Sequence, residues 1–311
     1  MPTMPRYRVT KSRNPAALEQ AIQYDSSDSE ADERITARRQ LAQSDRGVRL
    51  LPRTSADQAP RRLTRSSSLQ IQPAGVFRPQ DHFLAPEQHF PLQTIHTRTQ
   101  YPRYVNRFNS KEIMLVVDGS CVNNGAGVGH NPPVGEENAP KGGLSFIYNY
   151  NAGKIAMPLE QKGPRGDTHR HTSNRAKLRA VIAALDFRPW HGEGWQTVVV
   201  VTDLEYVVHG ATRWLPAWVA RRWRLAPRRD ARGRLRLGRK LANRDLWEEL
   251  QSRIESLRVN GTEVAFWLVP PRSLVRQDSE LLREAKSAAR EAARGSGAAV
   301  GDYTRLCGLF V

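Results

Sequence analysis

The chain has 311 residues, and its 48 basic and 31 acidic side chains give a formal net charge of +17. Its two cysteines, Cys121 and Cys307, are too few for a disulfide framework or a zinc cage. No apolar run approaches the roughly 18 residues of a membrane span. These features exclude disulfide-rich secreted domains and integral membrane proteins. They favour an intracellular protein, nuclear or cytoplasmic, and the basic, acid-free residues 1–15 keep a mitochondrial address open.

The amino-acid composition changes near residue 110, from one typical of disordered chains to one typical of folded domains. All seven Trp follow that point, whereas half of the 20 Pro precede it. We therefore expect a disordered N-terminal region over residues 1–109, one folded domain over 110–295 and a flexible tail over 296–311. An acidic serine tract (residues 25–30) and a basic serine tract (61–68) could accept phosphate. One alternative function is thus a scaffold that recruits a partner through a phosphorylated tail.

The first folded elements are predicted to be three strands. Residues 111–117 form an apolar run that ends at Asp118 in an Asp-Gly pair. Residues 125–143 are rich in Gly and Pro and predict a loop. Residues 144–150 and 153–159 predict two further strands joined by a tight turn. The three strands together form an antiparallel meander.

A helix and a buried strand follow the meander. Thr172 or Ser173 can cap the helix, and apolar residues recur after it at helical spacing. Residues 197–202 form a fully apolar run that ends at Asp203, as expected of a strand buried on both faces in parallel pairing. If this strand pairs in parallel with residues 111–117, Asp118 and Asp203 lie side by side at the same edge of the sheet.

The remaining elements complete an α/β domain. Residues 205–218, 246–257 and 280–294 predict helices, and residues 263–269 predict the last strand. The predicted architecture is a mixed five-stranded sheet, three antiparallel strands followed by parallel strands, flanked by helices.

An intensely basic stretch interrupts this pattern at residues 221–240. It carries ten Arg or Lys residues against the single acid Asp230, and Trp218 and Trp223 flank its start. Interleaved arginine and tryptophan suit phosphate contact combined with stacking on bases. A solvated loop is the alternative interpretation. Because phosphate contacts release counterions, the large positive charge predicts a polyanionic partner.

Four motifs in order give the sequence a family resemblance. They are Asp118-Gly119-Ser120, the segment Thr172 to Leu178, the segment Val201 to Val207, and Asn243-Arg244-Asp245-Leu246-Trp247. Together they resemble the ribonuclease H family, type 1. The resemblance implies a ribonuclease H-like fold and hydrolysis of the RNA strand of an RNA/DNA hybrid. It also implies two Mg²⁺ ions held by four acidic side chains.

Two of the four implied acids are present at matching positions. Asp118 and Asp203 would be the catalytic residues and metal ligands, whereas Lys177 and Ser279 stand at the other two positions. A one-residue shift could bring Asp278 or Glu280 to the place of Ser279. An ammonium about 4 Å from a cation site costs several kcal/mol at an effective dielectric constant near 20. We therefore expect hydrolysis to be weakened or lost, the alternative being an atypical but active ribonuclease.

The nucleic-acid-binding surface implied by the resemblance is better preserved. Its partner would be an RNA/DNA hybrid or another duplex. Lys177 could clamp a phosphate, form an ion pair with Asp118 or Asp203, or do both. The expected binding residues are polar, basic or aromatic: Asn123, Ser173, Asn174, Arg175, Trp218, Arg221, Arg222, Trp223, Arg224 and Asn243.

Overall fold

The computed structural model describes residues 71–94, 102–124, 139–149, 153–295 and 300–306. The two serine tracts, Cys307 and most of the predicted loop over residues 125–143 lie outside these ranges. None of the helices in the described ranges is long and apolar enough to cross a membrane.

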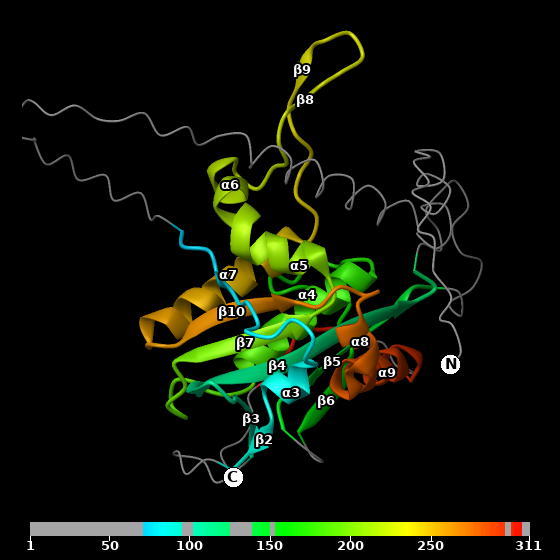
Figure 1. Ribbon diagram of the computed structural model, residues 1–311. Helices are drawn as coiled ribbons and strands as arrows, with labels where there is room; N and C mark the ends of the chain where they lie inside the picture. The colour runs from blue at the N-terminus through cyan, green and yellow to red at the C-terminus, as the bar shows by residue number, and fades with distance from the viewer. Residues whose placement is uncertain (1–70, 95–101, 125–138, 150–152, 296–299, 307–311) are drawn as a thin grey trace, which may run out of the picture.

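A mixed sheet forms the centre of the fold (Figure 1). The antiparallel meander consists of β4 (Asn109–Val122), β5 (Lys141–Ile147) and β6 (Lys154–Pro158). On the other side of β4, β7 (Thr197–Thr202) pairs with it in parallel, and β10 (Glu263–Leu268) pairs in parallel with β7. The predicted α/β fold, with three antiparallel and then parallel strands, is therefore confirmed.

Helices cover both faces of the sheet. α4 (Ser173–Asp186) and α7 (Arg244–Val259) lie on one face, where they enclose the larger apolar core. α9 (Glu280–Arg294) and the short α3 (Pro86–His89) lie on the opposite face and enclose a smaller core. The central strands are buried on both sides, which explains why the residues of β7 are apolar throughout.

The helix predicted over residues 205–218 is continuous but changes its winding. It consists of α5 (Glu205–His209), a π-helical segment η2 (Gly210–Trp214) and α6 (Leu215–Ala220). A short α8 (Leu274–Asp278) precedes α9 and is capped by Ser273, whose side chain accepts a hydrogen bond from the Arg276 backbone.

The sheet extends beyond the N-terminal boundary predicted at residue 110. β1 (Gly75–Val76) pairs in parallel with β10, and β3 (Arg103–Asn106) pairs antiparallel with β4 and with β2 (Leu92–Gln93). These strands have two to four residues, too few for a recognisable alternation of polar and apolar side chains. Parts of residues 71–109 are therefore integral to the fold.

The predicted C-terminal tail is also partly packed against the domain. The guanidinium of Arg179 stacks over the ring of Tyr303 at 4.4 Å from its centroid. Backbone hydrogen bonds join Val300 and Gly301 to Gln161 and Lys162.

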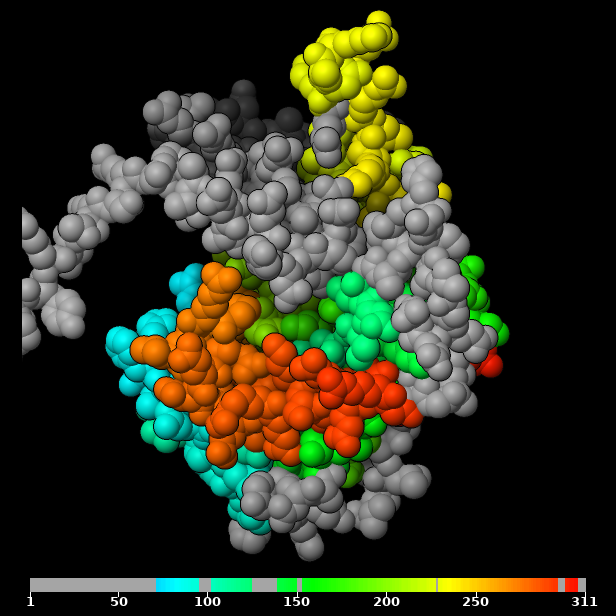
Figure 2. Space-filling view, turned by 90° about the vertical axis from the view of Figure 1, so that its right-hand side faces the viewer, coloured from blue at the N-terminus to red at the C-terminus, as the bar shows by residue number. Residues whose placement is uncertain are grey.

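The basic stretch forms a protruding hairpin. β8 (Arg228–Arg229) and β9 (Leu235–Arg236) pair antiparallel and project from the body of the domain. Figure 2 shows this hairpin in yellow, well separated from α8 and α9, which are orange to red. Asp230 stabilises its turn by accepting hydrogen bonds from the backbone of Arg232 and Arg234.

Candidate functional site

Asp118 lies inside β4 and not at its end. The strand continues to Val122, and the Asp118 side chain is almost completely buried. The sequence suggested a turn at Asp118-Gly119, but Gly119 has a different role. A Cβ atom at Gly119 would lie 2.3 Å from the backbone nitrogen of Lys177, so the missing side chain lets α4 cross β4 at close range. That close approach brings Lys177 to Asp118.

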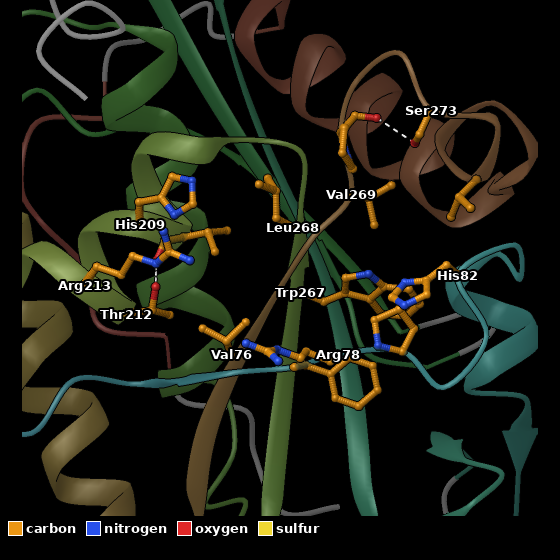
Figure 3. Close-up of a pocket in the computed structure, with 15 residues that line it drawn as sticks. Val76, Arg78, His82, His209, Thr212, Arg213, Trp267, Leu268, Val269 and Ser273 are labelled. Carbon is orange, nitrogen blue, oxygen red and sulfur yellow. Dashed lines mark hydrogen bonds between the residues drawn. The ribbon is translucent and has the colours of Figure 1, made fainter. Parts of the chain in front are cut away.

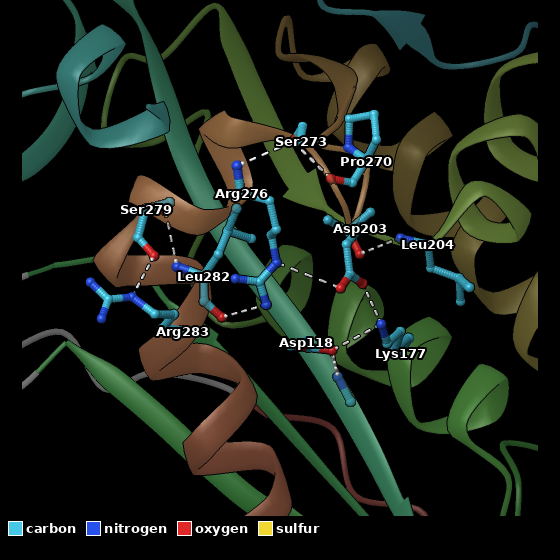
Figure 4. A network of polar contacts seen from close by, with 12 residues as sticks. Asp118, Lys177, Asp203, Leu204, Pro270, Ser273, Arg276, Ser279, Leu282 and Arg283 are labelled. Atoms are coloured by element: carbon cyan, nitrogen blue, oxygen red, sulfur yellow. Dashed lines mark hydrogen bonds and ion pairs between the residues drawn. The ribbon is translucent and has the colours of Figure 1, made fainter. Parts of the chain in front are cut away.

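The parallel pairing of β4 and β7 brings the second carboxylate to the same place. Val116 is in register with Val201, so Asp118 and Asp203 each follow a paired position by two residues. The side chain of Lys177 lies between them (Figure 4). Its Nζ is 3.2 Å from Oδ1 of Asp118 and donates a short hydrogen bond to Oδ1 of Asp203. Lys177 thus pairs with both acids at once.

A second cation reaches the cluster from α8. The Nε of Arg276 lies 3.7 Å from Oδ2 of Asp203, and its guanidinium also donates to the backbone carbonyl of Leu282 (Figure 4). Sequence reasoning missed Arg276, because it lies between the last predicted strand, residues 263–269, and the last predicted helix, residues 280–294, where no element was predicted. The available signal was Ser273, a helix N-cap residue three positions before it.

Burial and pairing set the charge of this cluster. Burial alone would lower the pKa of Lys177, but the two carboxylates raise it above its usual value. Burial raises the pKa of Asp118, and the Lys177 ammonium offsets this only in part. Burial also acts to raise the pKa of Asp203, but Lys177 and Arg276 hold that pKa below its usual value. The two acids and two bases balance when all are charged.

Ser279 does not face the two aspartates. Its hydroxyl caps α9 by accepting a hydrogen bond from the Leu282 backbone, and it donates to Oε2 of Glu87 at 2.8 Å. The other oxygen of Glu87 accepts from the Glu280 backbone at 2.6 Å. The neighbouring side chains of Asp278 and Glu280 are exposed. Glu87 lies in the region expected to be disordered, so the sequence could not predict this contact.

Arg175, which was expected to contact the nucleic-acid backbone, belongs to a buried ion pair. Its side chain is 2% exposed, and its two terminal nitrogens lie 3.0 and 2.7 Å from the two oxygens of Asp245. Asn243, just before α7, also accepts a hydrogen bond from Arg175. Arg175 therefore joins α4 to the start of α7.

The two tryptophans that flank the basic stretch are also structural. Trp218 is 1% exposed and packs against Trp214 and Trp247, so its ring has no face free to stack on a base. Trp223 is 9% exposed, and the guanidinium of Arg244 lies 5.8 Å from its ring centroid. Of the three arginines near Trp223 that were expected to bind nucleic acid, Arg221 and Arg222 are exposed and Arg224 is half-buried.

The remaining expected binding residues gather near the start of α4. Ser173 is half-buried, Asn174 is largely buried, and Asn123 is exposed at the end of β4 with a left-handed φ of 55°. Gly142 links the end of β4 to the segment just before α4, because it pairs with Cys121 in the sheet and donates its N–H to His171. In the described part of the chain, no group of three or more His, Cys, Asp or Glu side chains is placed to hold a metal ion.

Comparison with known proteins identifies the family. The family model described as RNase H matches residues 110–265, which is half of the chain and includes Asp118, Lys177 and Asp203. The chain belongs to the RNase H family. This membership agrees with the sheet topology and with the four sequence motifs.

Curated RNase H relatives resemble the chain over part of its length. Ribonuclease H of Treponema pallidum is 36% identical over 94 residues, which cover 30% of this chain and 48% of that protein. Ribonuclease H of Xanthomonas oryzae is 29% identical over 150 residues, which cover 48% of this chain and 77% of that protein. The chain thus spans about half of the Treponema protein and about three quarters of the Xanthomonas protein.

Solved RNase H structures are more distant. The RNase H domain of prototype foamy virus is 16% identical, with a TM-score of 0.36 and coverage of 58% of this chain and 91% of that domain. RNase H1 from Halobacterium salinarum is also 16% identical, with a TM-score of 0.31 and coverage of 58% and 96%.

Proposed function

We propose that this RNase H-family protein binds the backbone of an RNA/DNA hybrid or another duplex without efficient hydrolysis. The observation that carries the proposal is the ammonium of Lys177, which lies between the carboxylates of Asp118 and Asp203. In this proposal, Lys177 and Ser279 replace two of the four acids that the family resemblance implies. Family membership supports the nucleic-acid partner, and the Lys177 contacts support the weakened chemistry.

The side chains of the cluster do not fit a pair of magnesium ions. Mg²⁺ requires near-octahedral oxygen ligands, and clustered carboxylates normally offset its charge. Here the ammonium of Lys177 contacts both carboxylates, and the Arg276 guanidinium adds a second positive charge 3.7 Å from Asp203. A divalent cation could bind the two carboxylates only by displacing the Lys177 ammonium and the Arg276 guanidinium, which would otherwise repel it. We infer that the cluster stabilises the fold and leaves no step for two-ion catalysis.

The basic hairpin supports the binding half of the proposal. The arginines at positions 229, 232, 234 and 236 are exposed on a protruding arm, while Arg175 and Asp245 join α4 to the start of α7, the helix that follows the arm. Exposed guanidinium groups can pair with phosphates in two-point contacts, and such pairing carries no sequence preference. The buried tryptophans contribute a rigid support for the arm. We therefore assign nucleic-acid binding to phosphate contacts of the hairpin arginines rather than to stacking of bases on Trp218.

The experiment follows one labelled RNA/DNA hybrid for both retention and cleavage. Filter binding across a salt series should give an affinity that falls steeply with salt, at about 0.9 logarithmic units per phosphate contact for each logarithmic unit of salt. Replacing Arg232 and Arg234 with Gln should reduce that slope by up to about 2. A matched control replaces Arg283 with Gln, because Arg283 is exposed on α9, away from the hairpin, and pairs only loosely with Glu280.

Two outcomes would contradict this proposal. An affinity independent of salt would remove the nucleic-acid partner. Cleavage in Mg²⁺ or Mn²⁺ that Asp118→Asn abolishes would instead support the atypical ribonuclease. The scaffold alternative depends on the N-terminal serine tracts, and partner capture that survives deletion of residues 1–70 would contradict it.

A further inference from the structure

We propose that the domain contains a second ligand site, a cavity for a compact aromatic anion that is distinct from the Asp118–Lys177–Asp203 cluster. The cavity has a volume of about 400 Å³. It lies where the segment after β1 passes the end of β10, with α5 and η2 on one side and α8 on the other (Figure 3). Small-molecule sites in proteins usually occupy about 300–1,000 Å³, so the space suits a ligand with one or two rings.

The cavity depends on a part of the chain that lies outside the region matched by the RNase H model. Val76, Phe77, Arg78, Pro79 and His82 form one wall, whereas the matched region is residues 110–265. This wall is held in place by β1, whose pairing with β10 is limited to two residues. The cavity is therefore a feature that the N-terminal segment adds to the family domain.

An open strand edge supplies hydrogen-bonding groups inside the cavity. Phe266 accepts a hydrogen bond from the Phe77 backbone, after which the N-terminal segment leaves the edge of β10. Val269 directs its N–H to Thr202 of β7, on the opposite edge. Because backbone groups alternate along a strand, Leu268 directs its N–H and carbonyl toward the cavity side, as Phe266 does. An anionic oxygen of a ligand can accept a hydrogen bond from this N–H.

The charge of the cavity selects an anion. Arg78 and Arg213 approach it from opposite walls, and His82 and His209 also line it (Figure 3). No Asp or Glu is among the described residues that line the cavity, and no ion pair of Arg78 or Arg213 is found in the described part of the chain. Two guanidinium groups without acidic partners favour a carboxylate, sulfonate or phosphate group.

The floor of the cavity selects an apolar body for the ligand. Trp267, Val208 and Val269 are buried side chains that form it, whereas Val76 at the rim is 49% exposed. Thr212 and Arg213 belong to the π-helical turn η2, and π-helical turns occur frequently at functional sites. Apolar walls with a few convergent polar groups are typical of ligand sites. The combination of floor and rim fits an aromatic ring that carries an acidic group.

The test uses the full chain and the fluorescent probe 8-anilinonaphthalene-1-sulfonate at moderate salt. We expect saturable binding at one site, displaced by 2-naphthoate. The uncharged 2-naphthamide should be at least tenfold weaker, because it lacks the charge that meets Arg78 and Arg213. Acetate should also be at least tenfold weaker, because it lacks the apolar body.

Variants then locate the probe. Val76→Trp, which fills the cavity from its exposed rim, should abolish saturable binding, and the double change Arg78→Gln/Arg213→Gln should weaken it at least tenfold. Arg290→Gln, on the exposed face of α9, should change it less than twofold. Because Arg78 and Arg213 are exposed, the double variant keeps the test valid if Val76→Trp does not fold. Binding that is absent, unchanged in the double variant, or equal for the naphthamide would overturn the proposal.

Discussion

Replacing Lys177 with Met tests whether its ammonium holds Asp118 and Asp203 together. The substitution keeps much of the side-chain volume but leaves two buried carboxylates without their shared cation. We expect the free energy of unfolding at pH 7 to fall by about 3–5 kcal/mol, the range observed when one partner of a buried ion pair is removed. A loss of this size should lower the thermal midpoint by roughly 10 °C.

The geometry of the cluster sets this magnitude. At the 3.2 Å separation of Lys177 and Asp118, the Coulomb attraction is about 5 kcal/mol at an effective dielectric constant of 20. The desolvation of the ammonium reduces the net contribution of Lys177. Arg276, at 3.7 Å from Asp203, still compensates one carboxylate in the variant, which favours the lower half of the predicted range.

The pH dependence of the free energy of unfolding provides an independent test of the same ion pairs. In the native chain the lowered pKa of Asp203 contributes stability above its unfolded value of 3.8, and this stability is lost as pH falls through the folded value. The raised pKa of Lys177 contributes stability below 10.5 that is lost as pH rises through the folded value. Without Lys177, the pKa values of Asp118 and Asp203 both rise, so protonation stabilises the variant. The difference between variant and native chain should therefore shrink from pH 7 to about pH 5.

Urea denaturation at several pH values, with chelator present, measures both effects. Lys162→Met is the matched control, because Lys162 forms an exposed pair with Asp302 and should contribute less than about 1 kcal/mol. A loss below 1 kcal/mol for Lys177→Met, with no dependence on pH, would refute the reasoning.

Three further experiments probe how α4 and α9 are held in place. Gly119→Ala should lower the free energy of unfolding by about 1–3 kcal/mol, because the new Cβ would overlap the backbone of α4, and urea denaturation showing no loss would contradict the close crossing. Arg179→Met should lower it by about 3–5 kcal/mol by leaving buried Glu160 unpaired. The added change Glu160→Leu should restore most of that loss, and no recovery would argue against an ion-pair effect. Ser279→Ala should cost about 1 kcal/mol through loss of the α9 cap, measured by thermal unfolding, and an unchanged midpoint would count against the cap.

Periodic elements of the fold were predictable because their sequence patterns are sustained. Residues 197–202 and 280–294 form a strand and a helix with the predicted bounds, since each has an unbroken apolar run or stripe. The parallel pairing of the two aspartate-bearing strands followed from burial on both faces. The N-terminal strands were missed because pairs of residues at a sheet edge carry no periodic signal.

Side-chain partners in the candidate site were less predictable. The sequence placed Lys177 near Asp118 and Asp203, but it could not show that one ammonium contacts both. Trp218 was expected to stack on bases, yet a tryptophan beside arginines has the same sequence signature whether it faces solvent or the core. Arg276 reaches Asp203 through the conformation of a loop and a short helix. Such contacts depend on tertiary structure that local patterns do not encode.

Binding of Mn²⁺, followed by electron paramagnetic resonance, tests the central claim most directly. If the Lys177 ammonium occupies the space between the carboxylates, the native chain should bind Mn²⁺ no better than Asp118→Asn. Lys177→Glu should then gain affinity that the added change Asp118→Asn removes. Stoichiometric binding by the native chain that Asp118→Asn abolishes would contradict the account.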